Sequence, residues 1–266
     1  MGSEENRAYL HTRRVRDVMV SDRRYTFESC RDLHVWFIPL VSPPLLVGEL
    51  EATLSADERA RADRLHFEQH RREYVLCRAV LRALLARYLG MSADQIRFAY
   101  GAHGKPALAP PFDRSRIHFN VSHSHGLAVY GVAPERAIGV DIERLRPIED
   151  LEAIATLFFA EAERESLARL TGEARVRGLF NCWTRKEAYL KAIGSGLALP
   201  LDRFATSLTP GDRPAILTIG GDMSAARAWR LAQLEPERDY VGAVAVRTPS
   251  VRTKIHRRAV EELCTT

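Results

Sequence analysis

The sequence predicts an α+β fold built of two similar halves, and two observations lead to this prediction. In each half a short apolar run typical of a strand is followed by a segment with helical periodicity and then by further strand-like runs. Each half also contains a long helical segment that stops at glycine, from about Glu68 to Leu89 before Gly90 and over 173–193 before Gly194. The repetition places the boundary between the halves near residue 135.

The first half begins with an expected strand at 34–38 and a chain break at Pro43-Pro44. Ser55 is typical of a helix N-cap, with Glu58 at the capping-box position. The long helix over 68–89 follows, then three more strands are predicted at 96–100, 117–121 and 127–133, and a strand at 137–142 opens the second half.

The second half is predicted to contain helices at 160–169 and 173–193, then strands near 204–208, 215–219, 227–233 and 240–246. We therefore divide the chain into a poorly ordered N-terminal segment, two α+β halves of which the second carries the metal site discussed below, and a basic, peripheral C-terminal tail. The ranges are 1–30, 31–135, 136–248 and 249–266.

Bulk composition excludes several classes of protein. The chain has 266 residues, 46% of them hydrophobic and 27% charged, with a net charge of +5, which suits an anionic partner. Its four cysteines form no C-x-x-C pair, which argues against a zinc ribbon or a disulfide framework and for a reducing compartment. Because no apolar stretch suggests a membrane span or a signal peptide, we expect a cytoplasmic protein.

The first motif is the predicted strand Ile138–Glu143. Asp141 and Glu143 stand two residues apart, so both carboxylates point the same way on an extended chain. Two neighbouring carboxylates repel each other unless a cation joins them, and Mg²⁺ is often held by such groups together with substrate phosphates. Alternatively, the pair lies at an exposed strand end.

The second motif lies on the predicted helix over 173–193. Trp183, Glu187 and Lys191 stand four residues apart and share one stripe, where a core-facing stripe would carry leucine, valine or alanine. The alternative is a surface Glu-Lys pair beside one core aromatic. We expect Trp183 to pack in the core and to have no catalytic role.

The third motif is the polar end of a strand, His118–Gly126, where Ser122 and His123 could donate hydrogen bonds to a phosphate. A polar turn is the plain alternative, and a His-x-His metal site lacks a third soft ligand nearby. No G-x-S-x-G elbow supports a hydrolase.

The fourth motif, Gly104-Lys105-Pro106, presents a lysine on a tight turn, which is useful against a phosphate. The chain has no Walker loop.

Together and in this order, the motifs resemble the signature of the Sfp-type 4′-phosphopantetheinyl transferases. The matching stretches are GKP at 104–106, NVSHS at 120–124, GVDIE at 139–143, WTRKEAYLK at 183–191 and GSGL at 194–197. The resemblance covers roughly residues 34 to 247.

The resemblance implies two halves related by pseudo-twofold symmetry, with a cleft for coenzyme A between them. It implies a Mg²⁺-dependent transfer of 4′-phosphopantetheine from coenzyme A to a serine of an apo acyl or peptidyl carrier protein, releasing 3′,5′-ADP. The length is typical of family members that serve secondary metabolism, and we expect a monomer.

The resemblance also implies roles for individual residues. Asp141, Glu143 and Glu187 would hold Mg²⁺, Glu187 or a metal-bound water would be the base, and Lys191 would steady the pyrophosphate and protonate the leaving phosphate. The residues expected to contact coenzyme A are Arg72, Gly104, Lys105, Pro106, Ser122, His123, Lys186 and Lys191.

Two alternatives remain at this level. The first is a basic nucleic-acid-binding protein that uses the arginines of 59–88 and the tail at 252–258, although the aromatics do not interleave with the basic residues as a stacking platform requires. The second is a family member that binds coenzyme A without turnover.

Overall fold

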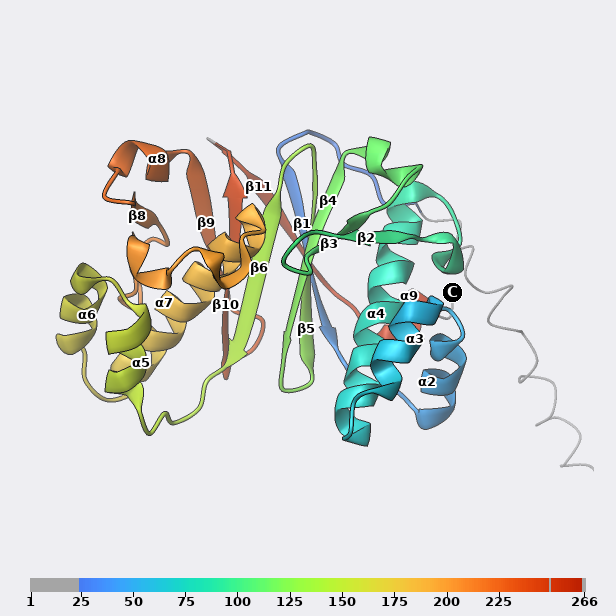
Figure 1. Ribbon diagram of the computed structural model, residues 1–266, viewed down its shortest axis with the longest axis horizontal. Coiled ribbons are helices and arrows are strands. Elements are labelled where there is room, and N and C mark those ends of the chain that lie inside the picture. Colours follow the sequence, from blue (N-terminus) through green and yellow to red (C-terminus); the bar gives the residue numbers. More distant parts are fainter. Residues whose placement is uncertain (1–23, 249, 265–266) are drawn as a thin grey trace, which may run out of the picture. The chain divides into compact units, whose positions relative to one another are not determined.

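The computed structural model describes residues 24–248 and 250–264, and within these no helix is long and apolar enough to cross a membrane (Figure 1). Residues 1–30 are predicted to be poorly ordered, and the first 23 of them lie outside the described part of the chain. The contacts group into two compact units. In the described part of the chain, unit 1 contains 24–26, Pro39–Ile96 and 258–264, and unit 2 contains Phe27–Ile38 with 97–248 and 250–257.

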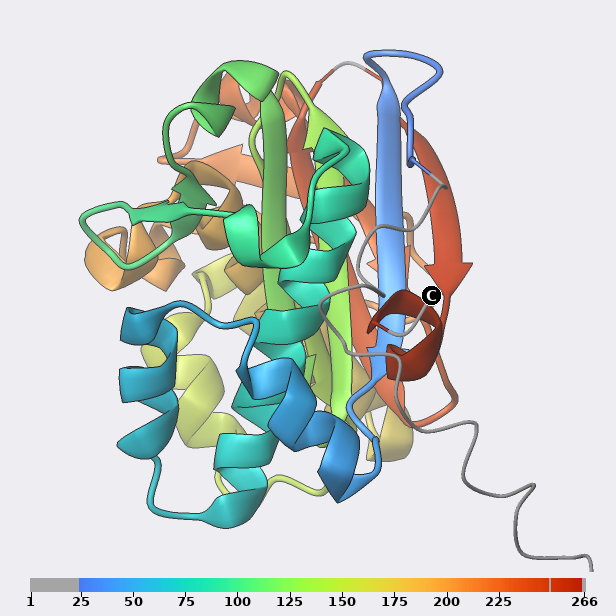
Figure 2. The ribbon, with the colours of Figure 1, turned by 90° about the vertical axis from the view of Figure 1, so that its right-hand side faces the viewer.

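Unit 1 is helical, and its central element is the long helix predicted from the sequence. Helix α4 (Glu68–Leu89) has the expected limits, and Gly90 ends it in the left-handed region with φ of 69°. Helices α2 (Pro44–Glu51) and α3 (Ala56–Asp63) pack beside it, and Figure 2 shows both in blue next to α4. Helix α9 (Val260–Cys264) also contacts α4.

The capping box predicted at the start of α3 is confirmed. The backbone N–H of Ser55 donates to Glu58 Oε2 at 3.0 Å. The Glu58 carboxylate is buried and is also bound by two arginines of α4: Arg78 Nη2 lies 2.5 Å from Oε1, and Arg82 Nε lies 2.6 Å from Oε2. These two arginines of the 59–88 region therefore serve the interior of unit 1 and offer no charge to a nucleic acid.

Unit 2 contains two larger sheets. The first has the order β11-β1-β5-β4 and the second the order β6-β10-β9. Their strands are β1 (Asp32–Pro39), β4 (Ile117–Ser124), β5 (Leu127–Pro134), β6 (Ile138–Arg144), β9 (Trp229–Leu234), β10 (Tyr240–Arg247) and β11 (Arg252–Arg257). Two small hairpins pair β2 (Phe98–Tyr100) with β3 (Pro106–Leu108) and β7 (Phe204–Thr206) with β8 (Ile216–Ile219). The predicted mixture of helices and sheets is confirmed.

Helix α7 (Gly172–Ile193) packs against β6 and β10. One apolar cluster joins strands of both large sheets, and a second lies where α7 meets β10. Helices α5 (Leu151–Phe158) and α6 (Glu161–Ala168) cover another face of α7 through a third cluster, as Figure 1 shows. The short helix α8 (Met223–Arg227) precedes β9.

The structure corrects two expectations for individual segments. The expected break at Pro43-Pro44 is the start of α2, because proline at the first helical position loses no intrahelical hydrogen bond. The tail from residue 249 is not peripheral in its described part, since β11 pairs in parallel with β1, and Arg252 Nε donates to the buried Asp32 carboxylate at 2.7 Å. A pairing across this sequence distance leaves no local signal. Figure 2 shows the two strands side by side.

Candidate active site

Strands β4 and β6 belong to different sheets but are joined by polar side chains at alternate positions of β4. Asn120 Oδ1 accepts a hydrogen bond from the backbone N–H of Val140 at 2.8 Å. Ser122 Oγ donates to Asp141 Oδ1 at 2.8 Å, and Ser124 Oγ donates to Glu143 Oε2 at 2.9 Å. The N-V-S-H-S pattern therefore places one amide and two hydroxyls on the strand face that meets the two carboxylates of β6.

Helix α7 adds a third carboxylate and a lysine to this group. Lys191 Nζ lies 2.6 Å from Asp141 Oδ1 and 3.0 Å from Ser122 Oγ. Burial raises the pKa of Glu187, the charges of Asp141 and Glu143 raise it further, and Lys191 opposes the rise. These mutual effects place Asp141, Glu143, Glu187 and Lys191 in one electrostatic cluster.

Glu143 is held in a similar balance. Burial raises its pKa and Asp141 adds to the rise, while the hydrogen bond from Ser124 and the charges of Arg146 and Lys191 lower it. Arg146 Nη1 lies 3.8 Å from Glu143 Oε2. An additional cation would relieve the repulsion within this cluster.

The close approach of α7 to β6 depends on Gly139. A Cβ at this position would lie 2.0 Å from the carbonyl oxygen of Ala188 and 2.4 Å from the backbone nitrogen of Ala192. Only glycine permits the helix backbone to lie this near the strand. Gly139 thus brings Asp141 on β6 within reach of Lys191 on α7.

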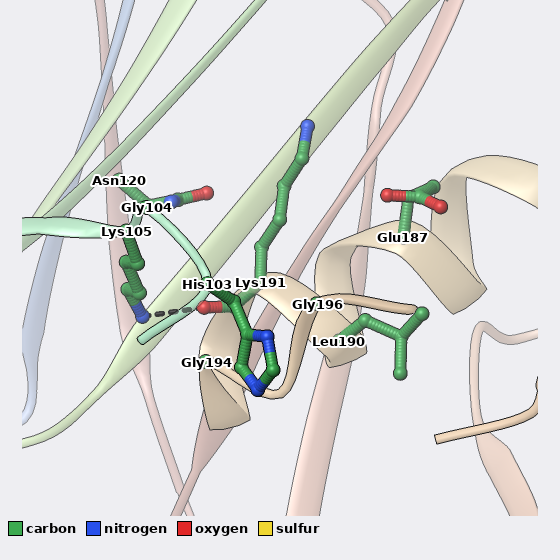
Figure 3. A pocket seen from close by; sticks show the side chains of 9 residues that line it. All are labelled: His103, Gly104, Lys105, Asn120, Glu187, Leu190, Lys191, Gly194 and Gly196. Atoms are coloured by element: carbon green, nitrogen blue, oxygen red, sulfur yellow. Dashed lines mark hydrogen bonds between the residues drawn. The ribbon is translucent and has the colours of Figure 1, made fainter. Parts of the chain in front are cut away.

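A pocket of about 230 Å³ opens beside this cluster, and Figure 3 shows its lining. Its residues come from the β2–β3 turn, β4, α7 and the Gly-Ser-Gly segment after α7: His103, Gly104, Lys105, Asn120, Glu187, Leu190, Lys191, Gly194 and Gly196. Sequence reasoning selected Gly104, Lys105, Glu187 and Lys191 but missed His103, Asn120 and Leu190. Of these three residues, only Asn120 could have been selected from the sequence, because it is the first residue of the NVSHS motif.

The ammonium group of Lys105 is held by backbone carbonyl groups. Its Nζ donates to the carbonyls of Ile138 at 3.1 Å and Ala192 at 3.2 Å, and also to that of Lys191 (Figure 3). Burial lowers the pKa of Lys105 to about 8, so the group stays largely protonated at pH 7. Lys105 satisfies carbonyls at the C-terminal end of α7 and joins the turn to the helix, and its direct contact with a ligand stays a prediction.

Lys186 is likewise misplaced by sequence reasoning. Its side chain is 1% exposed, and its Nζ lies 2.7 Å from Glu163 Oε2, 2.7 Å from the carbonyl of Leu201 and 2.6 Å from that of Phe204. With three partners in the interior, the ammonium cannot also neutralise a phosphate in the pocket. Lys186 lies one residue from Glu187, but its side chain leaves the helix on another face.

The remaining predicted residues have different surroundings. His123 is exposed, in keeping with the alternation along β4 that buries Ser122 and Ser124. Gly104 has φ of 76°, which explains glycine in the turn, and Pro106 begins β3. Arg72, in unit 1, donates from its guanidinium to the carbonyl of Ser42. Trp183 is half-buried and packs edge-on against Phe158 with ring centroids 5.6 Å apart.

Asp141, Glu143 and Glu187 are the three carboxylates of the predicted metal site. Across residues 24–248 and 250–264 no three or more His, Cys, Asp or Glu side chains are arranged closely enough to hold one. The Lys191 ammonium lies against Asp141 instead. The donor set nevertheless fits a hard cation, because all three are carboxylates and Asp141 Oδ2 is buried with no hydrogen-bond partner in the described chain.

Comparison with known proteins accounts for both parts of the chain. Residues 137–245 match the model of the 4′-phosphopantetheinyl transferase superfamily, and residues 48–135 match that of the 4′-phosphopantetheinyl transferase N-terminal region.

Individual relatives agree with these models. 4′-Phosphopantetheinyl transferase HetI of Nostoc is 43% identical over 81% of this chain and 87% of its own. A putative 4′-phosphopantetheinyl transferase of Synechocystis, slr0495, is 35% identical over 74% of this chain and 78% of its own. Sfp of Bacillus subtilis is 32% identical over 58% of this chain and 66% of its own. The chain therefore belongs to the 4′-phosphopantetheinyl transferase family of enzymes, of the Sfp type.

Proposed function

We propose that the chain transfers the 4′-phosphopantetheine arm of coenzyme A to a serine hydroxyl of an apo acyl or peptidyl carrier protein and releases 3′,5′-ADP. The observation that carries the proposal is the cluster of Asp141, Glu143, Glu187 and Lys191 beside the pocket at the end of α7. Family membership supplies the class of reaction, and the cluster supplies carboxylates for a cation and a base together with an ammonium for a phosphate.

Asp141, Glu143 and Glu187 would hold Mg²⁺, which when bound neutralises charge on the pyrophosphate of coenzyme A. Asp141 Oδ2, buried and without a hydrogen-bond partner in the described residues, supports this ligand set. The Lys191 ammonium, now 2.6 Å from Asp141, would turn its charge to a phosphate oxygen.

The protein groups would handle the protons of the transfer. Glu187 would accept the proton of the carrier serine as the serine oxygen bonds to phosphorus and the bond from phosphorus to the 3′,5′-ADP oxygen breaks. Burial and the neighbouring carboxylates raise the pKa of Glu187, which favours proton uptake. Lys191 would donate to the leaving phosphate.

Coenzyme A would enter the pocket at the Gly104 turn, where Gly104 and Pro106 line its adenosine end, and His123 would contact a phosphate. Ser122 is better suited to holding Asp141, because its hydroxyl proton is already donated there. Arg72 remains a proposed contact for coenzyme A. Lys105 and Lys186 support the site through the protein interior.

We further propose that the halves 31–135 and 136–248 each form one unit of the family fold, related by pseudo-twofold symmetry around the ligand cleft. The change from one family model to the other at residues 135 and 137 supports this boundary. The contact-based units have different limits because β1 and residues 97–135, which carry β2 to β5, group with the second half. A cytoplasmic monomer that serves secondary metabolism is part of the same proposal.

The test is mass spectrometry of several apo-carriers incubated with the protein, coenzyme A and Mg²⁺. We expect a mass gain of one phosphopantetheine on the carrier serine, and no gain with excess EDTA. Full modification in EDTA would refute the metal assignment, and no modification of any carrier would refute the transfer. The carriers that gain mass identify the pathway.

A further inference from the structure

The two carboxylates of β6 are each held through one oxygen. Ser122 and Lys191 both contact Oδ1 of Asp141. Ser124 and Arg146 both contact Oε2 of Glu143. Ser122 and Ser124 are two residues apart on β4, and Asp141 and Glu143 are two residues apart on β6. Each serine therefore binds one oxygen of the carboxylate opposite it.

Ser124 is buried, and its surroundings hold it firmly. Its hydroxyl accepts a hydrogen bond from the backbone N–H of Arg144 at 3.3 Å and lies 3.0 Å from Nδ1 of His125. A hydroxyl that donates its one proton to Glu143 can still accept from both the Arg144 N–H and the His125 ring.

His125 is fixed in turn by the hairpin between β4 and β5. It has φ of 47° and is followed by Gly126 with φ of 80°, the two positive values that a tight two-residue hairpin turn requires. Tyr240 Oη donates to the His125 carbonyl at 2.8 Å. The hydroxyl of Ser124 therefore contacts β6 and the turn, and Tyr240 of β10 binds the backbone of that turn.

We propose that Ser124 is a positioning residue for the transfer reaction: by binding Oε2 of Glu143 it would leave Oε1 as the oxygen available to a metal ion. This inference rests on the proposed function of the cluster. Ser124 itself would not contact the substrate. Its place as the second serine of the N-V-S-H-S pattern is explained by its hydrogen bond to Glu143, the second carboxylate of the G-V-D-I-E pattern.

The experiment measures Mn²⁺ binding in the presence of coenzyme A, by electron paramagnetic resonance of the free ion. Ser124→Ala should weaken Mn²⁺ affinity by about tenfold or more, as loss of an outer-sphere partner of a metal ligand does, and Ser124→Thr should restore most of it. Ser207→Ala is the matched control. It removes a half-buried hydroxyl that binds Arg185 and Ala215, and it should leave Mn²⁺ affinity unchanged.

A double-variant cycle separates positioning from general damage. In a Glu143→Ala background, Ser124→Ala should cause little further loss of Mn²⁺ affinity, because the oxygen that Ser124 orients is gone. Thermal unfolding shows whether Ser124→Ala is folded. If it is not, Ser124→Cys takes its place, because cysteine has a similar volume and forms a weaker hydrogen bond.

A folded Ser124→Ala or Ser124→Cys protein with Mn²⁺ affinity within about twofold of the parent would overturn the inference, given the loss expected for such partners. The inference would also be overturned if Ser124→Thr lost as much Mn²⁺ affinity as Ser124→Ala. It would be overturned too if Ser124→Ala caused the same loss of Mn²⁺ affinity in the Glu143→Ala background as in the parent. Because the readout is metal binding, these outcomes are distinct from failure of the parent protein to modify a carrier.

Discussion

At the scale of single residues, the candidate site depends on which atoms of each side chain are already engaged. On sequence alone, Lys105, Lys186 and Lys191 are all expected to contact coenzyme A, and only Lys191 of the three has an expected catalytic role. The structure distinguishes them, because the ammonium groups of Lys105 and Lys186 are each surrounded by interior acceptors, while that of Lys191 reaches the carboxylate cluster beside the pocket.

Glu187 is the residue on which the proposed chemistry depends most. Glu187→Gln removes a metal ligand and the base together, so we expect turnover to fall by at least about 100-fold. Glutamine is nearly isosteric, so the free energy of unfolding should change by no more than about 1 kcal/mol. Steady-state kinetics with a saturating carrier and chemical denaturation check the two parts. Near-native turnover would remove Glu187 from the mechanism.

At the scale of elements, the site is assembled where α7 crosses β6. The absence of a side chain at Gly139 permits this crossing, and a buried ion pair between Lys186 and Glu163 joins α7 to α6. Each can be tested without altering any group that would touch substrate.

Gly139→Ala would force the backbone of α7 away from β6, because the new Cβ would collide with main-chain atoms of Ala188 and Ala192. We expect a loss of about 1–3 kcal/mol in stability, as for an overpacked core, with a loss of turnover in the protein that remains folded. Gly48→Ala is the control. No atom lies within 4 Å of the new Cβ on α2, and a helical alanine should stabilise by about 0.5–1 kcal/mol. Equal stability of the two variants would contradict the close approach.

Lys186→Met would leave the Glu163 carboxylate buried without its cation. We expect a cost of about 3–5 kcal/mol, and recovery of much of it when Glu163→Gln is added. The exposed pair Arg116–Glu135 is the control, and Arg116→Met should change the free energy of unfolding by less than about 1 kcal/mol. Urea denaturation measures all four proteins. A fully folded, equally stable Lys186→Met variant with impaired coenzyme A binding would restore the ligand-contact assignment that the structure disfavours.

At the scale of the whole molecule, the net charge of +5 bears on how a carrier protein is recognised. An acidic carrier must approach a centre that is itself crowded with carboxylates, so the attraction has to come from basic or apolar surface around it.

We expect the KM for an acidic carrier to rise with NaCl while the maximal rate changes less. The reason is screening, since the Debye length falls from about 10 Å at 0.1 M to about 3 Å at 1 M salt. The measurement is carrier KM against NaCl at saturating coenzyme A. A KM that is flat or falls with salt would leave apolar contact as the main source of affinity.

Apolar residues of α5 are candidates for the salt-insensitive remainder. Leu157 is 70% exposed, whereas Phe159 is 2% exposed and belongs to the core. Leu157→Ser should therefore raise the carrier KM at high salt without loss of stability. Leu217→Ser, at another exposed leucine that lies on β8, provides the control. Equal KM values for both variants would exclude α5 as a contact.

Local pattern alone determined much of this protein. The limits of α4 and the end of α7 follow from helical periodicity and from glycines at the left-handed positions Gly90 and Gly194. The capping box at Ser55 and the strands β4, β5 and β6 follow in the same way. Motif order was enough to identify the family, because its signature consists of short segments whose spacing survives in the chain.

Only the tertiary structure decided which charged side chains face one another. The parallel pairing of β11 with β1, the close contact of Gly139 with α7 and the interior partners of Lys105 and Lys186 all join residues far apart in sequence. A lysine on a helix has the same local signal whether its ammonium meets a phosphate or a buried carbonyl. The outcome depends on neighbours that other segments supply, and for the same reason the partnership of Ser124 with Glu143 becomes visible only once β4 lies beside β6.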